Sequence, residues 1–242
     1  MSETTVRRLR LGSGLVLFAY ISFHLLNHAL GAVSLERAEQ VLGWSIALWH
    51  SRPGSALLNG ATGVHFALAL RTVFLRRNWK LPAIEIIRLG SGFSLPLLLI
   101  GYVVSTRLKA TLYDVVPSYG GTVSGLVTSG AEGWQLALLA PGWIHGCLGL
   151  WITLRRYRPL ERAWPGFLAV LILVPGLAAL GFVRMAAEVS TDLAARQGTG
   201  VSAEQRDHLL VWQTWMTRGY LALIVLAVAA GELRRRWLAR GQ

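Results

Sequence analysis

The sequence predicts an all-α membrane protein, a single bundle of six transmembrane helices with both termini in the cytoplasm. Of the 242 residues, 53% are apolar and only 15% are charged. Apolar blocks recur at the length of a membrane span, and basic residues gather at alternate ends of these blocks. A water-soluble domain of this composition would have too little polar surface to cover its core. We therefore expect a multi-pass protein of a bacterial inner membrane, with the lipid bilayer as its main partner.

Each apolar block is long enough to cross the hydrocarbon layer, which takes about 20 residues of helix. Pro175 interrupts the fifth block, which is tolerated where neighbouring helices satisfy the freed backbone groups. We see no linker, low-complexity tract or convincing internal repeat, so residues 1–242 are expected to form one membrane domain. The six predicted spans are Leu11–Ala32, Gly54–Leu75, Ile84–Thr106, Trp134–Leu154, Trp164–Val189 and Val211–Gly231.

The whole net charge of +12 falls on one predicted side of the membrane. This asymmetry is the signature of a cytoplasmic face, so it orients the bundle, and nucleic-acid binding is not expected. The basic residues of that side are Arg7, Arg8, Arg10, Arg71, Arg76, Arg77, Lys80, Arg88, Arg155, Arg156, Arg158, Arg162, Arg234, Arg235, Arg236 and Arg240.

Four of the six histidines, His24, His28, His65 and His145, fall inside predicted spans. Ionisable side chains are costly there and usually have a partner or a function. His65 and His145 each lie 11 residues from the outer end of their span, a depth of about 16 Å at 1.5 Å per residue. Both spans run in the same direction, so two imidazoles could approach a flat macrocycle from opposite faces and ligate a b-type haem. The alternative is a pair of separate, hydrogen-bonded core histidines.

Glycines near these two histidines are compatible with a planar group lying against the helix. Gly60 and Gly63 precede His65, and Gly146 and Gly149 follow His145. Glycine leaves room beside a helix backbone, although close helix packing through small residues explains the same pattern. Any haem must be held noncovalently, because the only cysteine, Cys147, cannot form a Cys-x-x-Cys-His attachment motif.

His24 and His28 are four residues apart, so they share one helix face and cannot clamp one iron from opposite sides. No glutamate lies between them, which excludes the zinc-protease motif. One of them could ligate a second haem nearer the outer surface, for which Tyr102 and His208 are the candidate second ligands. His50 is expected to be solvated at the membrane surface.

Several arginines could pair with haem propionates, because a guanidinium matches a carboxylate with two parallel donors. Arg71, Arg88 and Arg155 lie near the predicted inner face, where positive-inside topology explains them equally well. Arg107, Arg184 and Arg218 lie in the outer halves of their spans, where a surface-directed side chain or a contact with quinone or propionate would each be consistent.

Segments around these residues resemble a haem-binding six-helix membrane domain found at the N-terminus of certain bacterial class III adenylate cyclases. The resemblance extends from about Arg7 to Val189. It is carried by Phe23–Gly31 (FHLLNHALG), Val33–Glu36 (VSLE), Val103–Leu108 (VVSTRL), Ile144–Leu150 (IHGCLGL) and Leu180–Val183 (LGFV).

That domain is similar to the cytochrome b anchor of succinate dehydrogenase and fumarate reductase, whose diheme form has one histidine on each of four spans. The resemblance implies His24, His65 and His145 as the first-, second- and fourth-span ligands. Tyr102 stands where the third-span histidine would be, so the inner pair is complete and the outer haem is in doubt. Tyr102 could be a weak ligand, a quinone contact or a space-filler.

The resemblance implies a redox-sensing or quinone-sensing anchor that controls a cyclase domain following Gln242, and we expect a homodimer. The alternative is an electron-transfer subunit of a succinate dehydrogenase or fumarate reductase type of quinone oxidoreductase. The sixth span, which ends in a basic segment after Glu232, favours the sensor, because five spans suffice for the single-chain diheme anchor. A third hypothesis, a small transporter, would use the histidines as a proton relay.

Overall fold

The computed structural model describes residues 2–155, 162–191 and 201–240, and every secondary-structure element in these ranges is a helix. The all-α prediction is therefore confirmed for the described residues. Arg156 and Arg158, two of the basic residues used to assign the cytoplasmic side, lie outside them.

Five of the helices are long and apolar enough to cross a membrane: α1, the continuous helical segment from α4 to α5, α7, α9 and α11. They correspond to five of the six predicted spans. The second predicted span forms α3, which has a similar length but is not among these five helices. The helices are α1 (Glu3–Leu30), α2 (Leu35–Trp49), α3 (Arg52–Leu75), α4 (Ala83–Val103), the π-helix η1 (Val104–Leu108), α5 (Lys109–Tyr113), α6 (Tyr119–Ser129), α7 (Glu132–Leu154), α9 (Trp164–Ser190) and α11 (Ala203–Arg240).

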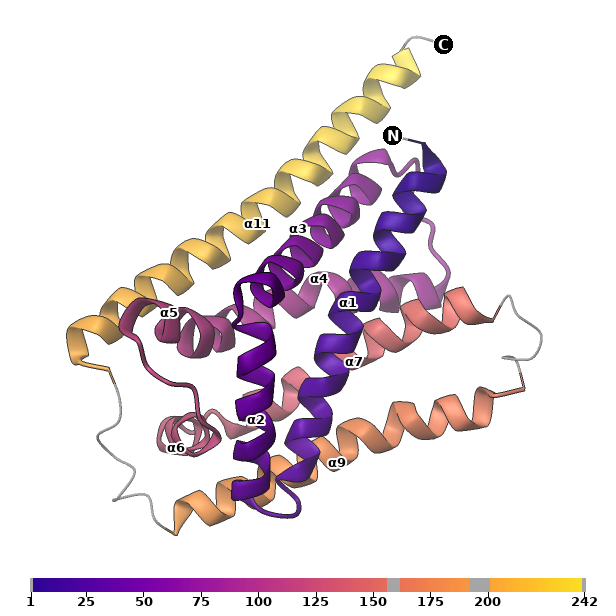
Figure 1. Cartoon of the computed structure of the whole chain (residues 1–242). Coiled ribbons are helices and arrows are strands. Elements are labelled where there is room, and N and C mark those ends of the chain that lie inside the picture. Colours follow the sequence, from indigo (N-terminus) through magenta and orange to yellow (C-terminus); the bar gives the residue numbers. More distant parts are fainter. Residues whose placement is uncertain (1, 156–161, 192–200, 241–242) are drawn as a thin grey trace.

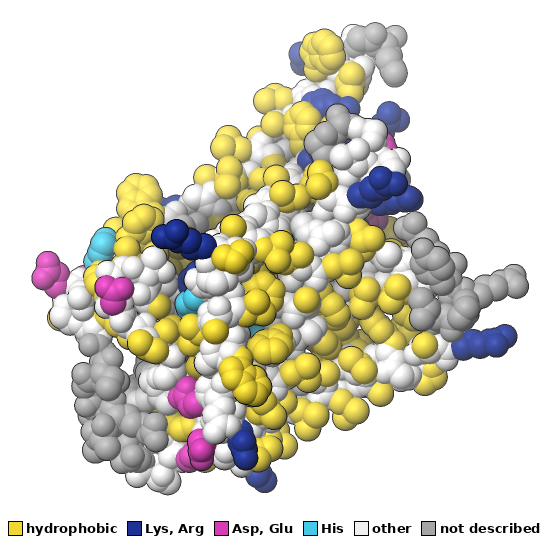
Figure 2. All heavy atoms as spheres, in the orientation of Figure 1, with side chains coloured by type: hydrophobic (Ala, Val, Ile, Leu, Met, Phe, Trp, Pro, Cys, Tyr) yellow, Lys and Arg dark blue, Asp and Glu magenta, His cyan; other side chains and the backbone are white. Residues whose placement is uncertain are grey.

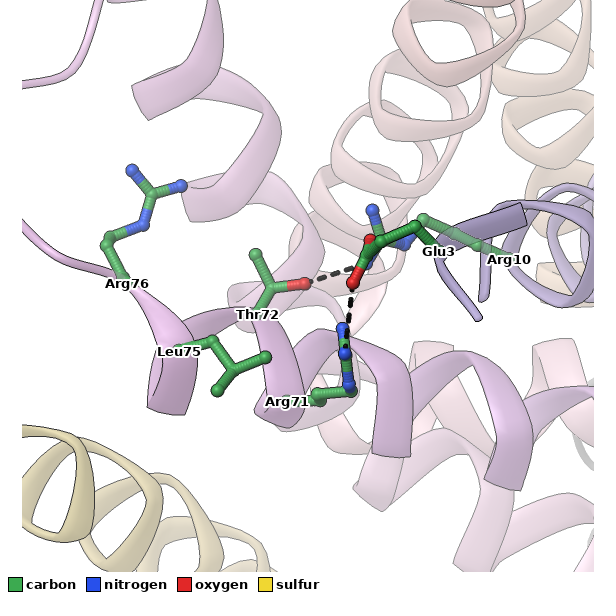
Figure 3. A pocket seen from close by; sticks show the side chains of 6 residues that line it. All are labelled: Glu3, Arg10, Arg71, Thr72, Leu75 and Arg76. Carbon is green, nitrogen blue, oxygen red and sulfur yellow. Dashed lines mark hydrogen bonds and ion pairs between the residues drawn. The ribbon is translucent and has the colours of Figure 1, made fainter. Parts of the chain in front are cut away.

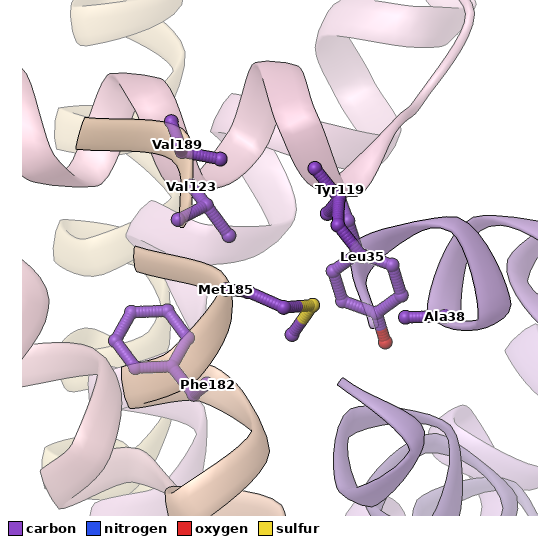
Figure 4. Packing of buried hydrophobic residues seen from close by; sticks show 7 residues of the cluster. All are labelled: Leu35, Ala38, Tyr119, Val123, Phe182, Met185 and Val189. Carbon is purple, nitrogen blue, oxygen red and sulfur yellow. The ribbon is translucent and has the colours of Figure 1, made fainter. Parts of the chain in front are cut away.

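Two outer connections that the sequence presented as loops contain helices. A serine caps the start of each of these helices. The Ser34 side chain accepts a hydrogen bond from the backbone N–H of the third residue of α2, and the Ser118 side chain does the same for α6. The two short helices pack against each other and join a buried apolar cluster with the outer end of α9 (Figure 4). This cluster is made of Leu35, Ala38, Tyr119, Val123, Phe182, Met185 and Val189, and it lies at the end of the bundle that the sequence predicts to be the outer one.

The central helix of the bundle is α1, which packs on α3, α7 and α9, while α4 packs on α7 (Figure 1). The last helix, α11, lies along α3 and α4. It has 38 residues and is therefore about 57 Å long, well beyond the hydrocarbon thickness of about 30 Å. Apolar side chains cover much of the face seen in Figure 2, as expected for helices in contact with lipid.

Both ends of the chain lie at the same end of the bundle (Figure 1). Glu3 at the start of α1 forms an ion pair with Arg71 near the end of α3, at 3.3 Å. Arg235, near the end of α11, donates a hydrogen bond to the Arg76 carbonyl just after α3, at 2.9 Å. These contacts bring together residues that the sequence assigned to one basic side.

The first prediction concerns which end faces the cytoplasm. In a protein whose buried Cys147 is replaced by serine, cysteines placed at Arg77 and Arg240 should be protected from an impermeant thiol reagent in intact cells. Cysteines at Arg52 and Ser118 should react. All four positions should react after the membrane is opened, which controls for local burial. Strong labelling at Arg240 in intact cells would contradict the predicted orientation.

Candidate functional site

His65 from α3 and His145 from α7 lie opposite each other in the bundle. Their ring centroids are 6.1 Å apart and the ring planes are nearly perpendicular, at 88°. The two residues are distant in sequence and meet because α3 and α7 run in the same direction and carry them at the same depth. The structure therefore brings the two predicted iron ligands together, and their role as ligands stays a prediction.

The Nδ1 atom of each ring already has a hydrogen-bond partner. His145 Nδ1 lies 2.9 Å from the Arg88 carbonyl, and His65 Nδ1 lies 3.2 Å from the Ser13 hydroxyl. A carbonyl only accepts, so Nδ1 of His145 donates, and the lone pair of this neutral ring is on Nε2. A histidine that ligates a metal usually donates its other ring N–H to such a partner, which fixes the ring orientation.

The two histidines rest on the same five-residue sequence, Arg-Leu-Gly-Ser-Gly, which occurs once in α1 and once in α4. Residues 10–14 pack against His65, and residues 88–92 pack against His145. A Cβ atom added at Gly14 would lie 3.3 Å from the His65 ring, and one added at Gly92 would lie 2.6 Å from the His145 ring. We name these two segments the α1 cradle and the α4 cradle.

The two cradles were not predicted from the sequence, where other glycines were expected to make room for the ligand. In the structure, a Cβ atom at Gly60, Gly63 or Gly149 would meet nothing within 4 Å, and one at Gly146 would meet Phe18 rather than a histidine. The signal that could have identified the cradles is the repeated pentapeptide itself, one copy in the first span and one in the third.

The arrangement of His65 and His145 fits a macrocyclic iron held by two axial ligands. With metal–imidazole bonds of roughly 2 Å, ring centres on opposite sides of one metal lie about 6 Å apart, which matches the measured separation of 6.1 Å. The described residues contain no group of three or more His, Cys, Asp or Glu suited to a bare metal ion. A haem needs only two ligands from the protein, because the porphyrin supplies the others.

The outer histidines form a different arrangement. His24 and His28 are hydrogen-bonded to each other through their Nε2 atoms, at 3.2 Å. Tyr102 lies beside His24, with ring centroids 6.0 Å apart, and Tyr119 of α6 lies 5.1 Å from His28. The His28 Nδ1 atom is buried and has no hydrogen-bond partner among the described residues. Tyr119 was not predicted at this site, because its segment was interpreted as a loop.

The remaining two histidines lie at other places in the fold. His208, at the start of α11, has Tyr113 and Trp212 as described hydrogen-bond partners, at 2.7 and 3.1 Å. His50 is exposed between α2 and α3. Desolvation by its neighbours and, second, the charge of Arg107 lower the pKa of His50.

Three of the arginines predicted as carboxylate or quinone partners, Arg71, Arg88 and Arg107, are engaged with protein groups. Arg88 lies 3.5 Å from Glu85, one turn away on α4, and Arg71 is paired with Glu3. In the outer half, Arg107 donates to the Ser55 hydroxyl at 2.6 Å. The Arg88 backbone also contacts the His145 ring.

No protein-family model, curated protein or solved structure matches this chain. The resemblance to a cyclase membrane domain therefore stays a prediction. The paired histidines and their two cradles are independent of it, since they follow from the geometry alone.

Proposed function

We propose that this chain is a haem-b-binding membrane domain that senses the redox state of membrane quinone and regulates an adenylate cyclase domain attached after Gln242. The observation that carries the proposal is the opposed pair of His65 and His145, each with its Nδ1 atom held by a neighbouring helix. Haem bound there would exchange single electrons and so change the charge between the two rings. The hydrogen bond between His24 and His28 supports one haem rather than two, because it engages the Nε2 atoms of both rings.

A continuous series of contacts leads from His145 to the end of the last helix. The His145 ring bonds the Arg88 carbonyl, and the Arg88 guanidinium lies near Glu85. Glu85 also pairs with Arg76, at 2.6 Å. The Arg76 carbonyl accepts from Arg235 of α11, which in turn pairs with Glu232. Charge interactions are stronger away from bulk water, so a charge change at the histidines would act first on Arg88.

For this series to regulate an effector, its contacts must differ in free energy between two arrangements of α11. Arg235 is the residue that joins α11 to the rest of the series, through a backbone carbonyl outside its own helix. Tyr220 provides a second contact nearer the membrane centre, because its hydroxyl donates to the Phe93 carbonyl of α4 at 2.6 Å. The contacts of α11 with α4 and with Arg76 are therefore the proposed route for the signal.

The second prediction tests this function in the chain fused to its cyclase. Cyclic nucleotide production should differ between oxidised and reduced quinone, and a difference of about 1.4 kcal/mol between arrangements would change the active population tenfold. The same sample should show a reduced-minus-oxidised absorption spectrum of a b-type haem with two histidine ligands. Arg235→Gln should keep the spectrum and weaken the redox response.

Arg240→Gln is the matched control, because it removes a similar charge from α11 at a position beyond the Arg76 contact. It should keep both the spectrum and the redox response. A b-type spectrum with equal activity under both quinone conditions would leave an inert haem-containing anchor. A folded protein that shows no haem absorption would contradict the proposal as a whole.

A further inference from the structure

A concave site lies where the start of α1 meets the end of α3, at the end of the bundle that holds both chain termini. The cavity is a shallow, open hollow with a volume of about 330 Å³. Three guanidinium groups and one carboxylate line it, so the lining has an excess of two positive charges. The lining residues are Glu3, Arg10, Arg71, Thr72, Leu75 and Arg76 (Figure 3).

Two of the arginines are held in place by neighbouring groups. Arg10 donates to the Thr72 hydroxyl at 2.9 Å, a contact between α1 and α3. Arg76 uses one terminal nitrogen to pair with Glu85 at 2.6 Å, and its side chain is only 12% exposed. The Arg76 Nε atom is buried and has no hydrogen-bond partner in the part of the chain that the structure describes. A buried donor without an acceptor is costly, but this atom has almost no exposed surface, so Arg76 contributes its positive charge to the cavity rather than a free Nε donor.

The third arginine, Arg71, is paired with a carboxylate that is easily displaced. Its partner Glu3 lies 3.3 Å away, in the first turn of α1, and the Glu3 side chain is 86% exposed. Ion pairs this exposed contribute little to stability. The Glu3 carboxylate therefore pairs with the Arg71 guanidinium in the way that a bound anion would. It can move into water when such an anion takes its place.

We propose that this cavity binds a phosphate group at the membrane surface, supplied by an anionic lipid headgroup or by free phosphate. Arginines bind phosphate oxygens through charge-assisted hydrogen bonds, and basic pockets between transmembrane helices commonly hold lipid headgroups. Leu75 gives the cavity an apolar wall, and Leu9 and Leu11 are exposed on the adjoining part of α1. These apolar neighbours favour the lipid as the source. The proposal does not depend on haem.

The test compares two sources of phosphate on the purified protein. Native mass spectrometry would measure retention of phosphatidylglycerol against phosphatidylcholine, and calorimetry of the delipidated protein would measure binding of inorganic phosphate. Arg71→Gln should weaken binding about tenfold or more, as expected for loss of a charge-assisted contact. Glu3→Gln should strengthen it, because the competing carboxylate is removed. Arg7→Gln, with the same charge change on an exposed part of α1 outside the cavity, should have little effect.

Preferred retention of phosphatidylglycerol would identify the lipid as the source, and binding of inorganic phosphate alone would identify the free anion. Equal binding by the wild type, Arg71→Gln and Arg7→Gln would overturn the proposal, as would Glu3→Gln weakening the interaction. Haem content is measured in the same samples. If Arg71→Gln loses haem, Arg71 serves the haem instead, and the separate phosphate site is wrong.

Discussion

Replacing His65 or His145 with alanine is expected to abolish haem binding, because neither imidazole has a substitute at its position. Each ring occupies one side of the proposed iron, and the two rings face each other at 6.1 Å. The groups around them do not offer another ligand: Ser13 and the Arg88 carbonyl bind the Nδ1 atoms, and Gly14 and Gly92 have no side chain. The purified variants should therefore lack the reduced absorption band.

His50→Ala is the matched control, because it removes an imidazole from an exposed position and should keep the spectrum. Far-ultraviolet circular dichroism would confirm that all variants are folded. The ratio of haem to protein in the wild type should be one, since His24 and His28 are bonded to each other. If both central variants keep the wild-type spectrum and stoichiometry, the assignment of the iron ligands is wrong.

Depth counting, together with topology, predicted that His65 and His145 lie at one level of the bundle. The rise of an α-helix per residue is constant, so two residues at equal distances from the same membrane face must lie at one level. Topology supplied the shared direction of their helices. What counting along the chain does not supply is the rotation of each helix about its axis. The glycines on α3 and α7 were therefore assigned to the ligand site, although Gly60, Gly63 and Gly149 face open space.

The partners of the two histidines could not be predicted from nearby sequence, because they belong to other helices. Ser13 is 52 residues from His65, and Arg88 is 57 residues from His145. The helices of the outer connections were missed for a related reason. Contacts with distant groups hold them, such as the hydrogen bond from the Gly120 amide to Glu39 and that from the Leu35 amide to Glu188.

The first and second glycines of each cradle are expected to respond differently to replacement by alanine. Alanine at a helical glycine normally stabilises a helix by about 0.5–1 kcal/mol, because glycine loses more backbone freedom on folding. Gly12 and Gly90, the first glycines of the two cradles, would meet nothing within 4 Å after such a change. At the second glycines the added methyl would touch a histidine ring, at 3.3 Å for Gly14 and 2.6 Å for Gly92.

Gly92→Ala is therefore expected to weaken haem binding sharply, whereas Gly90→Ala should leave it unchanged and raise thermal stability slightly. The Gly92 methyl would lie 2.6 Å from Cε1 and 2.9 Å from Nδ1 of His145, so the ring must shift, which disturbs the hydrogen bond of Nδ1 to the Arg88 carbonyl. Loss of a partner that orients a metal ligand typically lowers metal affinity about 10- to 100-fold. Haem titration of the apoprotein would measure this change. The effect of Gly14→Ala on haem affinity should fall between those of Gly90→Ala and Gly92→Ala. The added methyl at Gly14 would lie 3.3 Å from the His65 ring, farther than the 2.6 Å at Gly92, so His65 needs a smaller shift. Equal haem affinity in Gly90→Ala and Gly92→Ala would show that the α4 cradle does not position His145.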